Sequence, residues 1–311
     1  MLSGAGSCGL LSSEVTIVNS FPNFFAKARS CYQVKVGDIA ICAINDGFDY
    51  LAFTDIVSND RDLCQRLHEN EFRSVPPLLT INCFLIRSQD RLALIDAGYP
   101  TPTKTSGKLI EHLDSLGIQP ADIDTILMTH MHADHSAGLL DAEERPTFPN
   151  AKVFLHKDEL AYWLDEGAFA RASQVGQDEF RLVRRVVRAY GERIRQLDAE
   201  AGQIFPGVRL VETPGHTPGH AAWLVESGSE SLLVWGDIIH FPAIQFALPD
   251  TCVVYDVDAN AAADARKKIL AFAAERKLLV AGSHLDFPSF GHVIASHTGY
   301  RFVPEVWHPT E

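Results

Sequence analysis

Short apolar runs bounded by turn residues alternate with longer amphipathic stretches along most of this 311-residue chain. Two apolar runs, residues 79–86 and 91–96, are separated only by the polar Ser88-Gln89-Asp90, which predicts a hairpin. Apolar residues at helical spacing predict helices over residues 108–116, 160–164, 179–197 and 261–276. Other apolar runs predict strands over residues 34–44 (followed by an Asn45-Asp46-Gly47 turn), 123–128, 153–155, 208–211, 221–225, 231–235 and 278–281.

Strands and helices alternate in both halves of the chain, and no linker or shift in composition divides it. This order predicts an α/β fold of layered sheets and helices, with a single domain over residues 34–311. Residues 1–33 are predicted to form an N-terminal extension, which is aromatic at Phe21, Phe24 and Phe25. We expect this extension to pack on the domain or on a partner subunit, so a homodimer is one expectation.

The charge balance narrows the range of partners. The formal net charge is −13, from 27 basic and 40 acidic residues, so repulsion disfavours nucleic acid and anionic membrane surfaces. No apolar run is long enough to span a bilayer, and the N-terminus lacks the basic start of a signal peptide. The six cysteines are scattered without a C-x-x-C pair, which favours a reducing compartment. We therefore expect a cytoplasmic protein that binds a small molecule.

The candidate chemistry concentrates where predicted strands end. The strand over residues 123–128 runs directly into His130-Met131-His132-Ala133-Asp134-His135. His130 and His132 share a face because side chains alternate along a strand, and the following turn can bring Asp134 and His135 to the same side. Imidazole and carboxylate groups are typical ligands of zinc, and also of iron, cobalt or manganese. A polar loop with incidental histidines is the alternative interpretation.

Three more predicted strand ends supply residues of the same kind. Thr213-Pro214-Gly215-His216 forms a tight turn that can project its histidine into a cleft. Trp235-Gly236-Asp237 and Gly282-Ser283-His284 each follow an apolar run. An isolated aspartate in such a place is more often a helix cap or a turn residue. Four strand ends that each supply His or Asp nevertheless favour one shared metal site over four coincidences.

This ordered set resembles the metal signature of the metallo-β-lactamase superfamily, in order and spacing, over about residues 34–303. The resemblance implies an αβ/βα sandwich that binds two divalent metal ions, with Zn²⁺ expected and Mn, Fe or Co as alternatives. It also implies how the ligands are shared. The first ion is held by His130, His132 and His216, the second by Asp134, His135 and His284, and Asp237 bridges them.

Two further segments refine this resemblance. Asp96 lies in a stretch similar to the family's Asp-x-Gly segment, where it would orient a ligand histidine; a simple turn residue is the alternative. Residues 236–240 and 281–293 resemble the methyl parathion hydrolase-like branch, to which quorum-quenching lactonases are related. His240 stands where many acyl-homoserine lactonases have tyrosine, which favours the methyl parathion hydrolase-like subgroup.

The resemblance and the ligand set predict a metal-dependent hydrolase. Two ions that share a water lower its pKa, so a bridging hydroxide can attack a carbonyl carbon or a phosphorus. We expect cleavage of a lactone or a carboxylic ester, with organophosphate triester hydrolysis as the alternative and an iron-dependent oxidoreductase as a more distant one. The predicted catalytic residues are Asp134, Asp237 and His240, with Asp134 or His240 passing a proton to the leaving group.

Two rival functions fit less well. Cleavage of β-lactams is disfavoured because Asp237 occupies the bridging position and no cysteine ligand is present. A binding module without catalysis would be expected to have lost ligands, and none is missing.

Residues outside the ligand set have more open roles. His240 is either a proton donor or a hydrogen-bonded neighbour of the ligands. His220 and His292 are expected to close turns near the ligand loops, and His156 to be a polar residue before a helix. A substrate wall is predicted from four aromatic residues, although core packing is the alternative for a helical aromatic: Tyr99, Trp163, Phe169 and Phe180.

Overall fold

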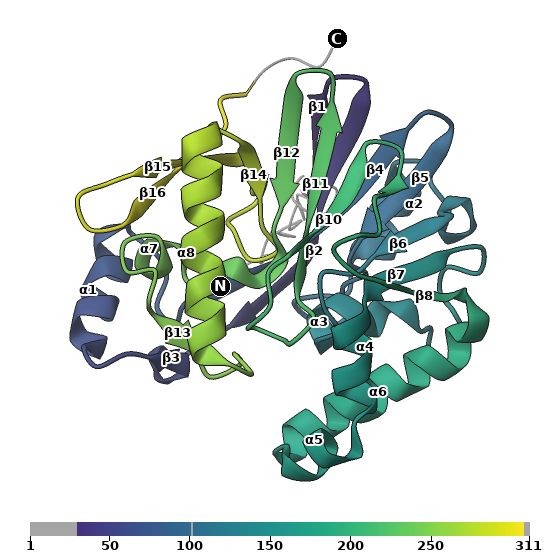
Figure 1. Ribbon diagram of the computed structural model, residues 1–311, viewed down its shortest axis with the longest axis horizontal. Helices are drawn as coiled ribbons and strands as arrows, with labels where there is room; N and C mark the ends of the chain where they lie inside the picture. The colour runs from purple at the N-terminus through teal and green to yellow at the C-terminus, as the bar shows by residue number, and fades with distance from the viewer. Residues whose placement is uncertain (1–29, 101, 308–311) are drawn as a thin grey trace, which may run out of the picture.

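The computed structural model describes residues 30–100 and 102–307, which form two facing sheets with helices on their outer faces (Figure 1). The first sheet has the order β1 (Cys31–Val36), β2 (Ile39–Tyr50), β4 (Leu78–Ser88), β5 (Arg91–Ile95), β6 (Thr125–Leu127), β7 (Lys152–His156), β8 (Ile194–Leu197). The second has the order β16 (Tyr300–Pro304), β15 (Gly291–Ala295), β14 (Leu279–Ala281), β12 (Glu230–Val234), β11 (Ala221–Ser227), β10 (Val208–Glu212), β9 (Gln203–Phe205). A small ribbon pairs β3 (Ile56–Val57) with β13 (Cys252–Val253).

Helices connect and cover these strands. The longest are α6 and α8, and α8 crosses the outer face of the second sheet in Figure 1. The helices are α1 (Arg61–Asn70), α2 (Leu109–Ser115), α3 (Ala133–Ser136), α4 (Lys157–Leu164), α5 (Glu166–Arg171), α6 (Gln174–Tyr190), α7 (Pro242–Gln245) and α8 (Ala259–Arg276). Among the described residues, no helix is both long enough and apolar enough to cross a membrane.

Residues on both faces of each sheet are buried, because one face packs against the other sheet and the opposite face packs against helices. In β5, Ala93 and Ile95 are buried against the second sheet, whereas Leu94 is buried against the helices. A strand that is covered on both faces becomes almost continuously apolar. On the other side, α8 buries residues such as Ile269 and Leu270 against the outer face of the second sheet. The predicted αβ/βα sandwich is therefore confirmed.

The strand directions bring the candidate ligands to one edge. Strands β5, β6, β7 and β8 are parallel to one another, and β12 is parallel to β14. The carboxyl ends of parallel strands meet at the same edge of a sheet, which is where open α/β sheets bind ligands. His130 follows β6, Asp237 follows β12 and His284 follows β14. The predicted metal residues consequently gather at one edge of the sandwich.

The first predicted strand and its turn were misplaced. Residues 34–44 are not one strand, because the chain reverses at Gly37, whose φ is +56°, and Val36 pairs with Ile39. Asn45-Asp46-Gly47 is not a turn either. It forms a β-bulge within β2, where the side-chain amide of Asn45 (Nδ2) donates to the Gly47 carbonyl. The turn-forming residues thus satisfy a local hydrogen bond inside a strand that continues.

The helix predicted over residues 179–197 has different ends. It begins at Gln174, because Ser173 caps it by accepting from the Gly176 amide, and it ends at Tyr190. Gly191 has φ +53° and breaks the helix, after which residues 194–197 pair with β7 as an edge strand. The remaining predicted strands and helices agree with the structure to within a few residues.

The N-terminal boundary can be placed only in part. Strand β1 begins at Cys31, so residues 31–33 belong to the sheet rather than to an extension. Phe21, Phe24 and Phe25 lie outside the described residues, and their predicted packing remains a prediction.

Replacing Trp223 by alanine tests the layer between the sheets. Its side chain is fully buried there, and its Nε1 donates to the Met128 carbonyl at 3.2 Å, two residues before the first candidate ligand. We expect Trp223→Ala to lower the free energy of unfolding by about 3–5 kcal/mol in urea denaturation. As a control, Phe72→Ala removes a ring that is 99% exposed and should change it by less than about 0.5 kcal/mol. Equal effects of the two substitutions would contradict this account of the core.

Candidate metal centre

Four strand ends supply seven side chains to a single cluster. The loop after β6 supplies His130 and His132, and α3 supplies Asp134 and His135. The turn between β10 and β11 supplies His216, while Asp237 and His284 follow β12 and β14. Ligand atoms of these residues lie within 4.8 Å of one another in overlapping groups of three. The structure therefore brings together all seven metal-binding residues predicted from the sequence.

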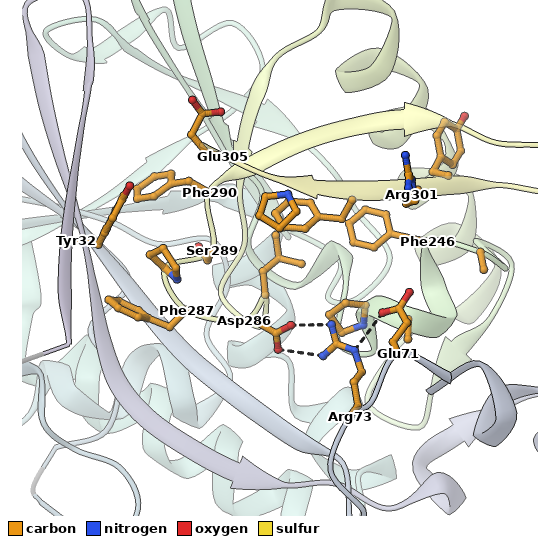
Figure 2. A pocket seen from close by; sticks show the side chains of 18 residues that line it. Tyr32, Glu71, Arg73, Phe246, Asp286, Phe287, Ser289, Phe290, Arg301 and Glu305 are labelled. Atoms are coloured by element: carbon orange, nitrogen blue, oxygen red, sulfur yellow. Dashed lines mark hydrogen bonds and ion pairs between the residues drawn. The ribbon is translucent and has the colours of Figure 1, made fainter. Parts of the chain in front are cut away.

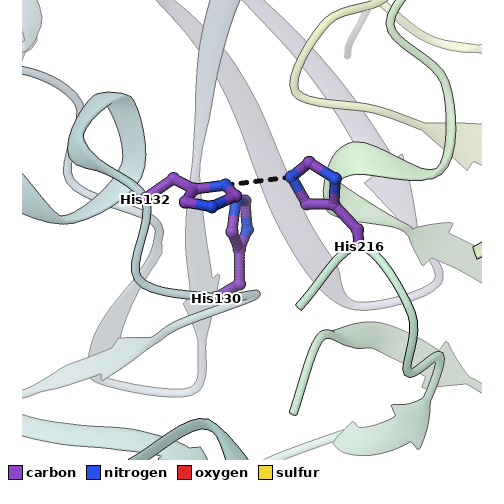
Figure 3. A group of neighbouring side chains, drawn as sticks. All are labelled: His130, His132 and His216. Atoms are coloured by element: carbon purple, nitrogen blue, oxygen red, sulfur yellow. Dashed lines mark hydrogen bonds between the residues drawn. The ribbon is translucent and has the colours of Figure 1, made fainter. Parts of the chain in front are cut away.

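The first group consists of three imidazole rings. His132 Nδ1 lies 3.0 Å from His130 Nε2 and 3.0 Å from His216 Nε2 (Figure 3). The ring planes of His132 and His216 are close to perpendicular, at 84°. Three nitrogens that converge from different directions on one point form the kind of donor set that tetrahedral zinc uses.

The second group consists of Asp134, His135 and His284, and it shares the carboxylate of Asp237 with the first group. Asp134 Oδ2 lies 3.4 Å from His135 Nε2 and 3.4 Å from His284 Nε2. Asp237 stands between the groups: its Oδ1 is 3.2 Å from His135 Nε2, and its Oδ2 is 3.3 Å from His216 Nε2. The Oδ2 atom is also 3.1 Å from His284 Nε2, so the Asp237 carboxylate lies against rings of both groups, as a shared ligand would.

Acceptors behind three of the rings fix their orientation. A carboxylate or carbonyl oxygen can only accept, so each ring carries a proton on Nδ1, and its Nε2 faces the centre, where it can bind a metal once the ring is neutral. These pairs are His135 with Asp96 at 2.8 Å, His216 with Asp256 at 2.8 Å, and His284 with the Thr80 carbonyl at 2.7 Å. Asp96 therefore lies where the resemblance implied, behind a candidate ligand histidine.

Buried polar atoms at the centre lack partners, which suits a metal. His135 Nε2 and Asp237 Oδ1 are buried and have no hydrogen-bond partner among the described residues. Leaving such groups unpaired costs roughly 1–3 kcal/mol each, and a cation between them would remove that cost. Imidazole nitrogens with carboxylate oxygens also match the donor chemistry of zinc and neighbouring first-row metals. The residues present thus fit two divalent ions.

The electrostatics favour the metal-binding protonation states of several groups. Burial lowers the pKa of His130 and His132, which keeps both rings neutral. Burial opposes charge on Asp237, but the charges of His135 and His284 outweigh it and hold the pKa of Asp237 well below its usual range. For His216, burial is outweighed by hydrogen bonds to carboxylates, which raise its pKa to about 9. Protons therefore compete with a metal at His216.

The cluster lies at the floor of an open cavity of about 970 Å³. Tyr99, Trp163 and Phe180 line this cavity, as predicted, although Trp163 and Phe180 are almost fully buried. Phe169 is not among the lining residues; its ring packs behind Phe180, with 5.9 Å between ring centroids. Its place in a substrate wall therefore stays a prediction.

Four histidines outside the ligand set have local partners. His240 lines the cavity, and its Nε2 lies 3.1 Å from Asp237 Oδ2. His220 Nε2 accepts from the Asp237 amide at 3.0 Å, so it holds the Asp237 turn. His156 caps the start of α4 as expected, and His292 joins Glu305.

Sequence reasoning missed the carboxylate that ties the two ligand loops together. Glu159, on α4, is fully buried and accepts from the Met131 amide at 2.8 Å and from Trp163 Nε1 at 2.7 Å. It also accepts from the Thr217 hydroxyl at 2.5 Å and from the Gly219 amide at 3.2 Å. A lone glutamate on a helix gives no sequence signal of this role, nor does Asp256 behind His216.

A second, smaller cavity of about 280 Å³ is lined in part by residues 285–290, which directly follow His284 (Figure 2). Aromatic rings such as Phe246 and Phe290 line it. Arg73 binds Asp286 at its rim through two contacts, of 2.9 and 2.7 Å. None of the seven candidate ligands lines this cavity, so it is separate from the metal cluster.

Comparison with known proteins agrees with this geometry. The family model described as the metallo-beta-lactamase superfamily matches residues 76–284. The chain belongs to the metallo-β-lactamase superfamily. Among curated relatives, an N-acyl homoserine lactonase of Bacillus cereus is 22% identical over 247 residues, which are 73% of this chain and 86% of that protein. Matches to several other curated proteins span only 58% to 63% of their length.

Two solved structures are similar over most of their length. The hydrolase AbOPH of the beta lactamase superfamily has a TM-score of 0.84 and 28% identity, covering 91% of this chain and 100% of that one. AidC, a dizinc quorum-quenching lactonase with a bound product, has a TM-score of 0.84 and 26% identity, covering 90% and 99%. These relatives of the superfamily support the expectation of a metal-dependent hydrolase.

Substituting Glu159 tests whether the two ligand loops depend on its carboxylate. In Glu159→Gln an amide replaces an oxygen that accepts from two donors, so at least one buried donor loses its partner. We expect the free energy of unfolding to fall by about 2–3 kcal/mol and zinc affinity to fall roughly 10–100-fold, measured by urea denaturation and zinc titration. Glu275→Gln, at an exposed position on α8, is the matched control. Unchanged zinc affinity in Glu159→Gln would contradict this role.

Proposed function

We propose that this protein is a hydrolase that uses two divalent metal ions to cleave a lactone or a carboxylic ester. The observation that carries the proposal is Asp237, whose carboxylate lies within 3.3 Å of rings of both ligand groups and lines an open cavity. The similarity to AidC, a dizinc lactonase, supports the same substrate class. Zinc is the proposed metal because the donor set consists of imidazole and carboxylate groups.

The proposed ligand sets follow from the side-chain nitrogen and oxygen atoms that face the centre of the cluster. One ion would be held by His130 Nε2, His132 Nδ1 and His216 Nε2, and the other by Asp134, His135 Nε2 and His284 Nε2, with Asp237 shared. Bound in this way, two ions would polarise a carbonyl group and acidify a water toward neutral pH.

Asp134 is proposed to move the proton that the leaving group needs. Hydrolysis adds water across the C–O bond, so one proton must reach the departing oxygen. The Asp134 side chain is 19% exposed and lines the cavity, whereas Asp237 is only 3% exposed. Of these two carboxylates, Asp134 therefore has the better access to a bound substrate.

His240 is proposed to position Asp237. Because Asp237 Oδ2 accepts, the His240 proton lies on Nε2, and its buried Nδ1 has no partner among the described residues. A neutral ring whose proton is already donated to Asp237 has none left for a leaving group. Of the two roles predicted from the sequence, the geometry thus favours the hydrogen-bonded neighbour over the proton donor.

Metal content and hydrolysis should be measured on the same purified sample. We expect two metal ions per chain by elemental analysis, and turnover of aryl esters or lactones that chelation abolishes and added zinc restores. The panel includes γ- and δ-lactones, acyl-homoserine lactones and methyl paraoxon, so the organophosphate alternative is tested in parallel. One iron per chain with no hydrolysis of any substrate would reject the proposal in favour of redox chemistry.

Paired substitutions separate metal binding from positioning. Asp237→Ala removes the shared oxygens, so we expect fewer than two ions per chain and loss of activity. His240→Phe keeps the seven ligands, so both ions should remain while kcat falls roughly 10–100-fold. If His240→Phe loses metal to the same extent as Asp237→Ala, His240 is itself a ligand and its positioning role is wrong.

A further inference from the structure

The cavity above the metal cluster has two unlike walls. One comes from the end of β2, from the 3-10 turn Phe53–Asp55 and from the loops after β5 and β13. The opposite wall comes from α4, α5 and α6 and is mainly apolar, with Trp163, Val175 and Phe180. We name the first the tyrosine wall, because it presents three tyrosines and two aspartates: Asp49, Tyr50, Asp55, Tyr99 and Tyr255.

Hydrogen bonds organise the tyrosine wall. The Tyr99 hydroxyl donates to Asp49 Oδ2 at 3.4 Å, and the Tyr255 hydroxyl is hydrogen-bonded to Asp55. The Val254 amide also donates to the Asp55 carbonyl at 2.9 Å, next to the pairing of β13 with β3. The two carboxylates are thus held beside phenol groups at fixed places along the cavity.

Among the described residues, the two aspartates of this wall are not neutralised by basic side chains. Within the described part of the chain, neither Asp49 nor Asp55 forms an ion pair with a lysine or an arginine. Of the six carboxylates among the described residues that line the cavity, Asp134 and Asp237 are candidate metal ligands and Asp256 pairs with His216; the one guanidinium, Arg171, belongs to the opposite wall. Burial, and then the Asp134 charge, raise the pKa of Asp49 and of Tyr99.

Two aromatic rings of this wall are exposed at the cavity mouth. Tyr50 is 59% and Tyr255 is 44% exposed, so both rings are accessible to a molecule in the cavity. Tyrosine faces next to carboxylates attract alkylammonium groups, since the ring quadrupole and the negative charge act in the same direction. A carboxylate on the substrate would meet repulsion here instead.

We propose that the tyrosine wall recognises a positively charged alkylammonium group on the substrate, with Asp49 as the main determinant of that specificity. The proposal rests on the ester or lactone hydrolysis proposed above and names the kind of substrate. The ammonium arm lies against Asp49, Tyr50 and Tyr255, and an apolar acyl portion lies against the helical wall.

A pair of esters that differ only in charge tests this specificity. Acetylcholine and 3,3-dimethylbutyl acetate have the same shape, but the first has a quaternary nitrogen where the second has carbon. On the zinc-loaded protein we expect kcat/KM, divided by the hydroxide-catalysed rate of each ester, to favour acetylcholine by about tenfold at low salt. This preference should shrink as ionic strength rises, because salt screens charges near the surface.

Variants assign the preference to the wall. Asp49→Asn should reduce the ratio of the two esters to between one and three, and Tyr50→Leu, at an exposed position, should lower it in part. Asp90→Asn removes the same charge from the exposed turn between β4 and β5 and should leave the ratio unchanged. A ratio near one in the unmodified protein, or a ratio unaffected by Asp49→Asn, would overturn the proposal.

Binding without turnover separates this inference from the proposed function. Calorimetry on the zinc-loaded protein should show choline binding more tightly than 3,3-dimethylbutan-1-ol, with the difference lost in Asp49→Asn. If neither ester nor any lactone is hydrolysed but choline still binds preferentially, the hydrolase proposal fails and the ammonium site stands. If neutral esters are hydrolysed but choline shows no preferential binding, the ammonium site fails and the hydrolase proposal stands.

Discussion

The metal cluster depends on one buried carboxylate, that of Glu159. Its oxygens accept from the loop that supplies His132 and from the turn that supplies His216, and these two segments follow strands of different sheets. The turn approaches so closely that a Cβ on Gly219 would lie 2.0 Å from the Glu159 nitrogen. Burying a charge is costly unless donors surround it, and here four donors do. The two halves of the sandwich are thereby locked at the distance that three converging imidazoles require.

Much of the fold follows from local patterns, and the errors have physical causes. Alternating and continuous apolar runs located most strands, because both faces of each sheet are covered and the strands had to be apolar. The errors fell where a turn-forming residue has another role. Asn45-Asp46-Gly47 makes a bulge inside β2, while Gly37 makes the true reversal, and Gly191 ends α6 seven residues before the predicted end. Turn residues mark a change in backbone direction, but tertiary pairing decides which change it is.

The candidate ligands could be predicted because the cluster is partly local. The segment from His130 to His135 is a strong signal by itself. Once it is found, His216, Asp237 and His284 can be recognised as further candidate ligands. Their supports could not be predicted in the same way. Glu159 contacts the ligand loops across 28 or more residues of sequence, and Asp256 contacts His216 across 40, through hydrogen bonds that leave no periodic trace. Whether an aromatic residue such as Phe169 reaches the cavity likewise depends on its depth within the helical layer, which is a tertiary property.

The residues proposed to carry out the reaction lie in the rigid part of the cavity, and those proposed to select the substrate lie in its exposed wall. The ligands stand on strand ends and are fixed from behind by Asp96, Asp256 and the Thr80 carbonyl, so their geometry leaves little freedom. The tyrosine wall is instead partly exposed, at Tyr50 and Tyr255, and the Tyr99 hydroxyl donates to Asp49 and not to one of those supports. In the helical wall, by contrast, Trp163 is buried and donates to Glu159. Substitutions in the tyrosine wall can therefore change which of the proposed substrates enters without moving a candidate metal ligand. A superfamily that shares one fold can serve many substrates by this route, since the site and not the fold determines the substrate. The specificity of this protein is accordingly to be sought in the charge and aromatic content of its walls.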